Sequence, residues 1–163
     1  MNAPFLPCKS VISGGQTGVD RAALDFAIAE NYAHGGWCPK GRKAEDGPIP
    51  ERYRLIETES ENYRQRTRRN VIDSDGTLIL NLGELADGTL ETQRIALREG
   101  KPYFVVALGD DAWESQFSGV RAWLGQHSIN RLNVAGPRES KRPGVYRLAR
   151  NFLSGLTRAR GAG

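Results

Sequence analysis

Cysteine and histidine are scarce in this chain, and their scarcity limits what the chain can do with metals. Cys8 and Cys38 are the only cysteines, and His34 and His127 are the only histidines, in 163 residues. Neither pair has the spacing of a zinc or redox motif. We therefore expect no protein-metal site, and we expect two unpaired thiols that favour a reducing, cytoplasmic location.

Long apolar runs are also missing. No stretch approaches the roughly 20 apolar residues that cross a bilayer, and Pro4 and Pro7 interrupt the region where a secretory signal would lie. We expect no association with a membrane.

Lysine and arginine exceed aspartate and glutamate by 23 to 19. This small excess fits an anionic ligand or a nucleic acid without choosing between them.

The sequence lacks the familiar catalytic and nucleotide-binding motifs. It contains no Walker A loop, no Gly-x-Gly-x-x-Gly fingerprint and no Gly-x-Ser-x-Gly elbow. Asp20, Asp75, Glu91 and Glu139 are available as acids or bases, but nothing in the sequence pairs them. The sequence therefore assigns no catalytic residue.

What the chain does have is a regular alternation of short β-rich runs and amphipathic helices. Strands are predicted over 9–13, 53–57, 77–82, 103–108 and 131–135, and helices over 18–32, 62–74, 87–100, 112–125 and 143–158. The runs TLILNL and YFVVAL are typical of parallel strands covered on both faces. We predict one α/β domain over 1–163 with a doubly wound, mainly parallel, Rossmann-like sheet. Its core spans about 9–156, residues 35–50 form a flap or loop, and residues 158–163 form a frayed tail.

Glycine and polar residues follow four of the predicted strands. The segments are 13–21, 83–89, 109–111 and 136–140. In a parallel α/β sheet, ligands bind outside the carboxyl ends of the strands. We therefore expect these four loops to converge on one pocket.

The first of these loops, SGGQTGVDR, has the composition of an anion-binding turn. Its glycines let the backbone approach a bulky anion, and the helix that follows offers unpaired N–H groups and the positive end of its dipole. The alternative is a strand-to-helix turn that uses glycine for geometry alone. The candidate ligand-binding residues here are Gly14, Gly15, Gln16, Thr17, Gly18, Asp20 and Arg21.

The loops after TLILNL and RLNVA supply further candidates. Gly88 and Thr89 open a helix, with Thr92 one turn further on, and Asp87 is predicted to be the N-cap of that helix. In the last loop the pattern leaves two alternatives for an Arg-Glu pair, a local salt bridge or contact with the ligand. The candidates there are Arg138, Glu139 and Ser140.

Two basic segments lie outside these loops. Lys40 and Arg42 stand among glycines in GWCPKGRKAEDG, where a basic flap over an anion is favoured slightly over a solvated loop. The arginines between Arg64 and Arg69 predict a solvated helix face, with room for one or two side chains to point into the pocket.

Several strings carry a resemblance to a known family. They are ISGGQTGVDRAALDFAI, GGWCPKGRKAEDGPIPERY, RTRRNVIDSDGTLIL, DGTLET and LNVAGPRES with PGVY, and they span roughly Val11 to Leu153. Together they resemble the circularly permuted YpsA branch of the SLOG superfamily, whose members are described as molybdenum carriers. The resemblance implies a Rossmann-like fold, a pocket for a nucleotide-derived or pterin-phosphate ligand such as molybdenum cofactor, and homo-oligomers, commonly dimers or tetramers. By motif position, residues 14–18, 20 and 21 match the first ligand loop, and Gly88 and Thr89 match the second.

The chain departs from the motif Pro-Gly-Gly-x-Gly-Thr-x-x-Glu of the related Lonely Guy hydrolases in two ways. Residues 84–87 lack the Pro-Gly-Gly, and Thr92 stands at the position of the catalytic glutamate, with Glu91 one residue early. One residue turns a helical side chain by about 100°.

The leading hypothesis is therefore a binding or carrier protein for a phosphate-bearing ligand, either molybdenum cofactor or a nucleotide. The alternatives are a nucleotide hydrolase that uses Asp20 or Glu91 and, ranked last, a nucleic-acid-binding module.

Overall fold

A five-stranded sheet lies at the centre of the computed structural model, which describes residues 6–109 and 113–158. The strand order is β2-β1-β9-β7-β8, and every pairing in this sheet is parallel. The strands are β1 (Ser10–Ile12), β2 (Ala33–Gly35), β7 (Gly76–Asn81), β8 (Tyr103–Ala107) and β9 (Arg131–Ala135). The parallel sheet confirms the prediction, although β2 was not among the expected strands.

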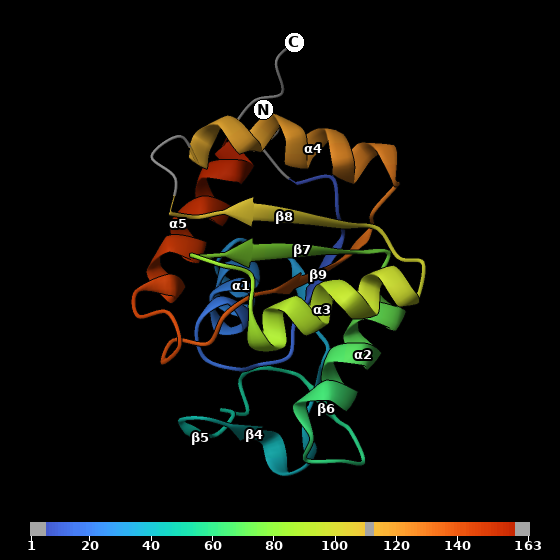
Figure 1. Ribbon diagram of the computed structural model, residues 1–163, viewed down its shortest axis with the longest axis vertical. Helices are drawn as coiled ribbons and strands as arrows, with labels where there is room; N and C mark the ends of the chain where they lie inside the picture. Colours follow the sequence, from blue (N-terminus) through green and yellow to red (C-terminus); the bar gives the residue numbers. More distant parts are fainter. Residues whose placement is uncertain (1–5, 110–112, 159–163) are drawn as a thin grey trace.

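Helices cover both faces of this sheet (Figure 1). Side chains of α1 (Val19–Ala29), α4 (Phe117–Gln126) and α5 (Val145–Arg158) share one core with Leu78 and Leu80 of β7. On the other face, α2 (Tyr63–Asp73) and α3 (Asp87–Arg98) pack together through Val71, Ile95 and Ala96. The doubly wound α/β fold is therefore confirmed.

The hydrophobic pattern explains why these helices form where they do. In α5 the buried apolar residues are Val145, Ala149, Phe152, Leu153 and Leu156, which recur at the spacing of one helical face. Leu78 and Leu80 alternate along β7 so that both reach the same core as this stripe. Burial of these side chains is the main favourable term that holds α5 to the sheet.

The segment expected to be a flap or loop is folded. It contains β3 (Trp37–Cys38), a 3₁₀ turn over Lys40–Arg42, β4 (Lys43–Ala44) and β5 (Gly47–Pro48), and β3 pairs with β6 (Ile56–Glu57). A second core beneath α1 is formed by Leu24, Cys38, Ala44, Ile49 and Tyr53. In Figure 1 this part lies at the bottom of the molecule, away from β8 and α4.

The ends of the chain add two observations. Helix α5 ends at Arg158, and the rest of the predicted tail, residues 159–163, lies outside the described residues. Within residues 6–109 and 113–158, no helix has the length and apolar character needed to cross a membrane.

Candidate functional site

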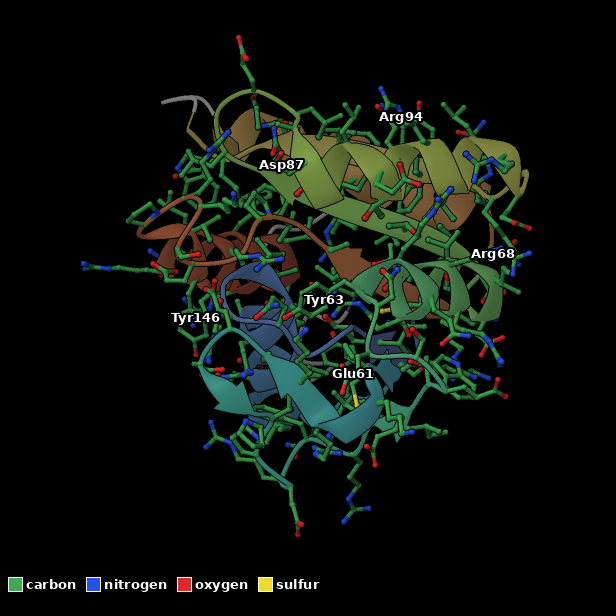
Figure 2. All side chains as sticks on the ribbon, turned by 60° about the horizontal axis from the view of Figure 1, so that its bottom comes forward. Glu61, Tyr63, Arg68, Asp87, Arg94 and Tyr146 are labelled. Atoms are coloured by element: carbon green, nitrogen blue, oxygen red, sulfur yellow. The ribbon has the colours of Figure 1, made fainter. Side chains whose placement is uncertain are left out.

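A cleft of about 190 Å³ opens at the carboxyl edge of the sheet. Its walls come from the segments that follow β1, β7 and β9, and from one side of α2. Figure 2 places Tyr63, at the start of α2, near the middle of this face, with Asp87 at the start of α3 above it. Three of the four expected loops therefore meet, while Gly109 does not line the cleft and residues 110–112 lie outside the described residues.

The loop after β1 contributes Gly14, Gln16 and Asp20 to the cleft. Glycine is required at Gly14 because a Cβ there would lie 2.3 Å from Nη1 of Arg66. It is also required at Gly18, where φ is +78° and a Cβ would lie 2.4 Å from the carbonyl oxygen of Pro137. The glycines thus pack the loop against α2 and against the loop after β9.

Most of the backbone N–H groups of this loop are used inside the protein. The Gln16 N–H donates to the Asp20 carboxylate at 3.2 Å, and the Thr17 N–H donates to Gln16 Oε1 at 3.0 Å. The N–H groups of Val19 and Arg21 donate to the carbonyls of Pro137 and Gln16. The prediction of unpaired N–H groups is therefore wrong for these four amides.

A buried ion pair lies at the start of α1. Nη1 of Arg66 is 3.4 Å from Oδ2 of Asp20 and donates to the carbonyl of Gly14 at 2.8 Å. Both residues are 8% exposed. Burial raises the pKa of Asp20, against the opposing effect of the Arg66 charge, and burial also lowers the pKa of Arg66. The anion at this helix N-terminus is thus the protein's own carboxylate.

Arg66 is buried on the cleft, in line with the expectation that one or two arginines of this helix point into the pocket. Its neighbours are solvated: Arg64 pairs with Glu91 and Arg68 pairs with Glu99, both at 3.1 Å, and each arginine side chain is more than half exposed. Figure 2 shows Arg68 on the outer side of α2.

The loop after β7 brings the N-terminus of α3 to the cleft. Ala86 occupies the N-cap position without a capping side chain, and the prediction that Asp87 caps the helix is wrong. The Asp87 carboxylate is instead 4.0 Å from Nζ of Lys141, and its side chain is 70% exposed. Ala86 O accepts from the N–H groups of Thr89 and Leu90, whereas those of Asp87 and Gly88 donate to no acceptor among the described residues.

Side chains of the same helix complete this wall. Gly88, Thr89 and Thr92 line the cleft, and a Cβ at Gly88 would meet nothing within 4 Å. The Thr92 hydroxyl donates to the carbonyl of Gly88 at 2.9 Å. Glu91 lines the cleft too, held by its ion pair with Arg64.

The three predicted residues of the loop after β9 make different contacts. Arg138 lines the cleft and lies over the ring of Tyr63, with 5.0 Å from its guanidinium carbon to the ring centre. The Glu139 carboxylate accepts from the N–H groups of Gly144 and Tyr146, and so caps the start of α5. The Ser140 hydroxyl donates to Glu45 at 2.5 Å. Of the two alternatives left open for Arg138 and Glu139, the local salt bridge does not form; Arg138 pairs instead with Glu45, 3.9 Å apart.

Several predicted residues lie away from the cleft. They are Gly15, Thr17, Gly18, Arg21, Lys40, Arg42, Glu139 and Ser140. Arg21 forms a two-point ion pair with Asp46, at 2.8 and 2.9 Å. Arg42 donates to the carbonyls of Ile49, Pro50, Tyr53 and Leu55. Arg42 therefore braces its own segment rather than reaching toward the cleft.

Sequence reasoning missed several polar and charged residues that line the cleft. They include Tyr63, Asn70, Asn81, Asn133, Lys141 and Arg142. Asn81 ends strand β7, so its place at a strand exit was a usable signal. Arg142, which donates to the carbonyl of Leu82 at 2.8 Å, gave no signal because its partner lies 60 positions away.

The charges on the cleft are nearly balanced. Five cationic side chains line it, Arg64, Arg66, Arg138, Lys141 and Arg142, against four carboxylates, Asp20, Glu84, Asp87 and Glu91. Nowhere in the described part of the chain do three His, Cys, Asp or Glu side chains gather as a metal site. The arrangement provides hydrogen-bond donors and charge for a polar ligand.

Residues 11–157 match the model of the circularly permuted YpsA SLOG family. The chain belongs to this family. A similar solved structure is that of the "Putative molybdenum carrier protein" from Syntrophus aciditrophicus SB, at 43% sequence identity and a TM-score of 0.90. The match covers 92% of this YpsA-type chain and 95% of the other. No curated protein sequence matches the chain.

Membership confirms the resemblance that the sequence strings predict. The matched range begins within β1 and contains α2, β7, α3 and β9, so the segments that line the cleft belong to the family fold. The match ends within α5.

Proposed function

We propose that this YpsA-type protein binds and carries a small phosphate-bearing ligand, molybdenum cofactor or a nucleotide derivative, in the cleft between α2, α3 and the loops after β1 and β9. One observation carries the proposal. The buried guanidinium of Arg66 and the uncapped N-terminus of α3 lie on the same cleft. Phosphate oxygens favour both environments, because each offers N–H donors and positive charge.

Arg66 has a donor to spare for such a ligand. Its Nη1 serves Gly14 and Asp20, and its Nε donates to the carbonyl of Tyr63 at 3.4 Å. Within the part of the chain that the structure describes, Nη2 donates to no residue. The N–H groups of Asp87 and Gly88 add two further donors from the opposite wall.

Molybdenum cofactor is favoured as cargo by the relative that bears the name of a molybdenum carrier. A pterin phosphate brings its own metal ligands, so the protein has to hold only the organic part and its phosphate. The donor set of the cleft, arginine, amide and threonine side chains with backbone N–H groups, fits that task. This donor set does not fit direct coordination of a metal ion.

Thermal unfolding in the presence of candidate ligands tests the proposal. Molybdenum cofactor or nucleotides at 100 times Kd should raise the stability by about 2.7 kcal/mol. Arg66→Met should abolish the shift, whereas Arg68→Met, the same change on the exposed side of α2, should leave it intact. A shift with molybdate alone, or no shift with any phosphorylated ligand, overturns the proposal.

A nucleotide hydrolase is the second candidate, because two carboxylates that line the cleft, Asp20 and Glu91, are available to it. Its test is incubation with nucleoside monophosphates and detection of the free base. Release of base that Glu91→Gln abolishes establishes the enzyme; binding without release supports the carrier. The exposed arginines of α2, Arg64 and Arg68, weigh against a nucleic-acid interface, since each already has a carboxylate partner.

Two further parts of the proposal concern the state of the protein. We propose a homo-oligomer, dimer or tetramer, which sedimentation analysis tests directly. The cytoplasm is the proposed location, because Cys8 and Cys38 are both free thiols and both buried.

A further inference from the structure

Two buried amide side chains on the cleft each leave one polar atom without a hydrogen bond. Gln16 is 4% exposed and Asn81 is 6% exposed, and both line the cleft. Within the described residues, Nε2 of Gln16 and Oδ1 of Asn81 have no partner. Buried polar atoms are rarely left unpaired, because the lost hydration is costly.

The orientation of each amide is fixed by its other end. Oε1 of Gln16 accepts from the N–H groups of Thr17, at 3.0 Å, and Glu45, at 2.9 Å. Nδ2 of Asn81 donates to the carbonyl of Gly83 at 2.9 Å. Turning either amide over would set donor against donor or acceptor against acceptor. Among the residues that line the cleft, Gln16 therefore has an unpaired buried donor and Asn81 an unpaired buried acceptor.

The two atoms belong to different walls. Gln16 follows β1 and Asn81 ends β7, and β9 lies between these strands in the sheet. A ligand that lies across the carboxyl end of β9 is placed between them. Such a ligand reaches Arg66 on the side of Gln16, and the start of α3 on the side of Asn81.

We infer that Gln16 and Asn81 select ligands that carry a neutral hydroxyl or N–H donor beside the phosphate, so that bare phosphate esters are poor ligands. This rests on the proposed function. A fully ionised phosphate monoester has only acceptor oxygens, which suit Gln16 Nε2 but not Asn81 Oδ1. A polyol or sugar phosphate, or a phosphate ester with a ring N–H, satisfies both atoms.

Calorimetric titration with two probes tests the selection. Ribose 5-phosphate has hydroxyl donors beside its phosphate, and n-pentyl phosphate has the same phosphate without them. The wild-type chain should bind ribose 5-phosphate about tenfold more tightly, the effect of one good hydrogen bond. Asn81→Leu should remove this preference by weakening the binding of ribose 5-phosphate relative to n-pentyl phosphate, and Asn81→Ala provides the same test if the leucine variant does not fold.

Gln16→Glu tests the donor. It keeps an oxygen for the Thr17 and Glu45 N–H groups but replaces the free donor with an acceptor, so the affinity for both probes should fall at least tenfold. Gln126→Glu, the same change at an exposed position of α4, should have no effect. Equal wild-type affinity for the two probes, or a preference that survives in both Asn81 variants, overturns the selection while the proposed function stands. Failure of both probes, together with nucleotides and molybdenum cofactor, to bind the wild type overturns the proposed function itself.

Discussion

The segments after β1 and β7 look alike in sequence, since each has glycine and threonine close to the start of a helix, but the structure uses them differently. In the first loop, four N–H groups donate hydrogen bonds to acceptors within the protein, and the Asp20 carboxylate lies at the start of α1. The second leaves α3 uncapped, and its first two N–H groups have no partner among the described residues. The glycine-rich loop after β1 thus has a mainly structural role, whereas the Asp87-Gly88-Thr89 segment brings unpaired N–H groups to the cleft.

The largest expected effect on stability comes from replacing aspartate with asparagine in the first loop, and the same change in the second loop is its control. Asp20→Asn leaves the buried Arg66 charge without its partner, so the free energy of unfolding should fall by about 3 kcal/mol. Asp87→Asn, at a side chain that is 70% exposed, should change the free energy of unfolding by less than about 0.5 kcal/mol. Urea denaturation of both variants measures the difference. Equal losses would contradict the assignment of scaffold to the first loop.

A glycine of the first loop gives the next largest effect. Gly18→Ala brings a Cβ within 2.4 Å of the Pro137 carbonyl at a φ of +78°. The free energy of unfolding should fall by about 2 kcal/mol or more, since side chains rarely adopt this conformation. Thermal unfolding followed by circular dichroism measures the loss. An unchanged Tm would mean that the loop moves away from β9 at little cost.

The matching glycine of the second loop should behave in the opposite way. Gly88→Ala adds a methyl group in open space within a helix, so stability should rise by about 0.5–1 kcal/mol. The added methyl group stands at the uncapped helix end, and ligand affinity should fall. Titration with ribose 5-phosphate, alongside thermal unfolding, checks both signs. Unchanged affinity would place the phosphate elsewhere in the cleft.

The smallest expected effect concerns Glu45, whose carboxylate accepts hydrogen bonds from Thr17 of the first loop and from Ser140 of the loop after β9. Burial opposes ionisation of Glu45, but hydrogen bonds from Ser140 and Thr17 and the nearby Arg138 charge lower its pKa overall. Because the folded-state pKa lies below the unfolded one, Glu45 stabilises the protein above the ordinary pKa of glutamate, and this contribution is lost as pH falls through the folded-state value.

Glu45→Gln measures that contribution. Glu45 is partly exposed, so the loss at pH 7 should be about 1 kcal/mol or less. Between pH 7 and pH 3 the Tm of the variant should depend less on pH than that of the wild type. Parallel pH profiles would show that the Glu45 carboxylate contributes nothing through its charge.

The fold and the general place of the cleft could be predicted from the sequence because both depend on local patterns. TLILNL and the α5 stripe record burial directly, and strand exits locate the cleft by topology. The expectation that YFVVAL is covered on both faces is wrong, because it forms the edge strand β8, in which only Val106 is buried. Strand β2 escaped prediction because Ala33, His34 and Gly35 carry no β-rich pattern; pairing with β1 makes them a strand.

Individual roles at the cleft were harder to predict because they depend on distant partners. Arg66 looks like its exposed neighbours in sequence, but it is buried against Asp20, 46 positions away. Arg42 looks like part of a basic flap, but it braces carbonyls of residues 49–55. Charged side chains have the same appearance in sequence whether they face water or a partner, and only the tertiary structure separates these cases.

The position of β9 at the centre of the sheet has a consequence for biosynthesis. Strand β9 joins β1 to β7, although β1 precedes it by more than a hundred residues. A nascent chain that has not reached residue 131 therefore holds two half-sheets without the strand that joins them. Contacts between such distant segments slow folding, and apolar strand edges exposed in the meantime favour aggregation. The domain is expected to complete its core late in synthesis, when β9 enters the sheet and α5 packs beside α1.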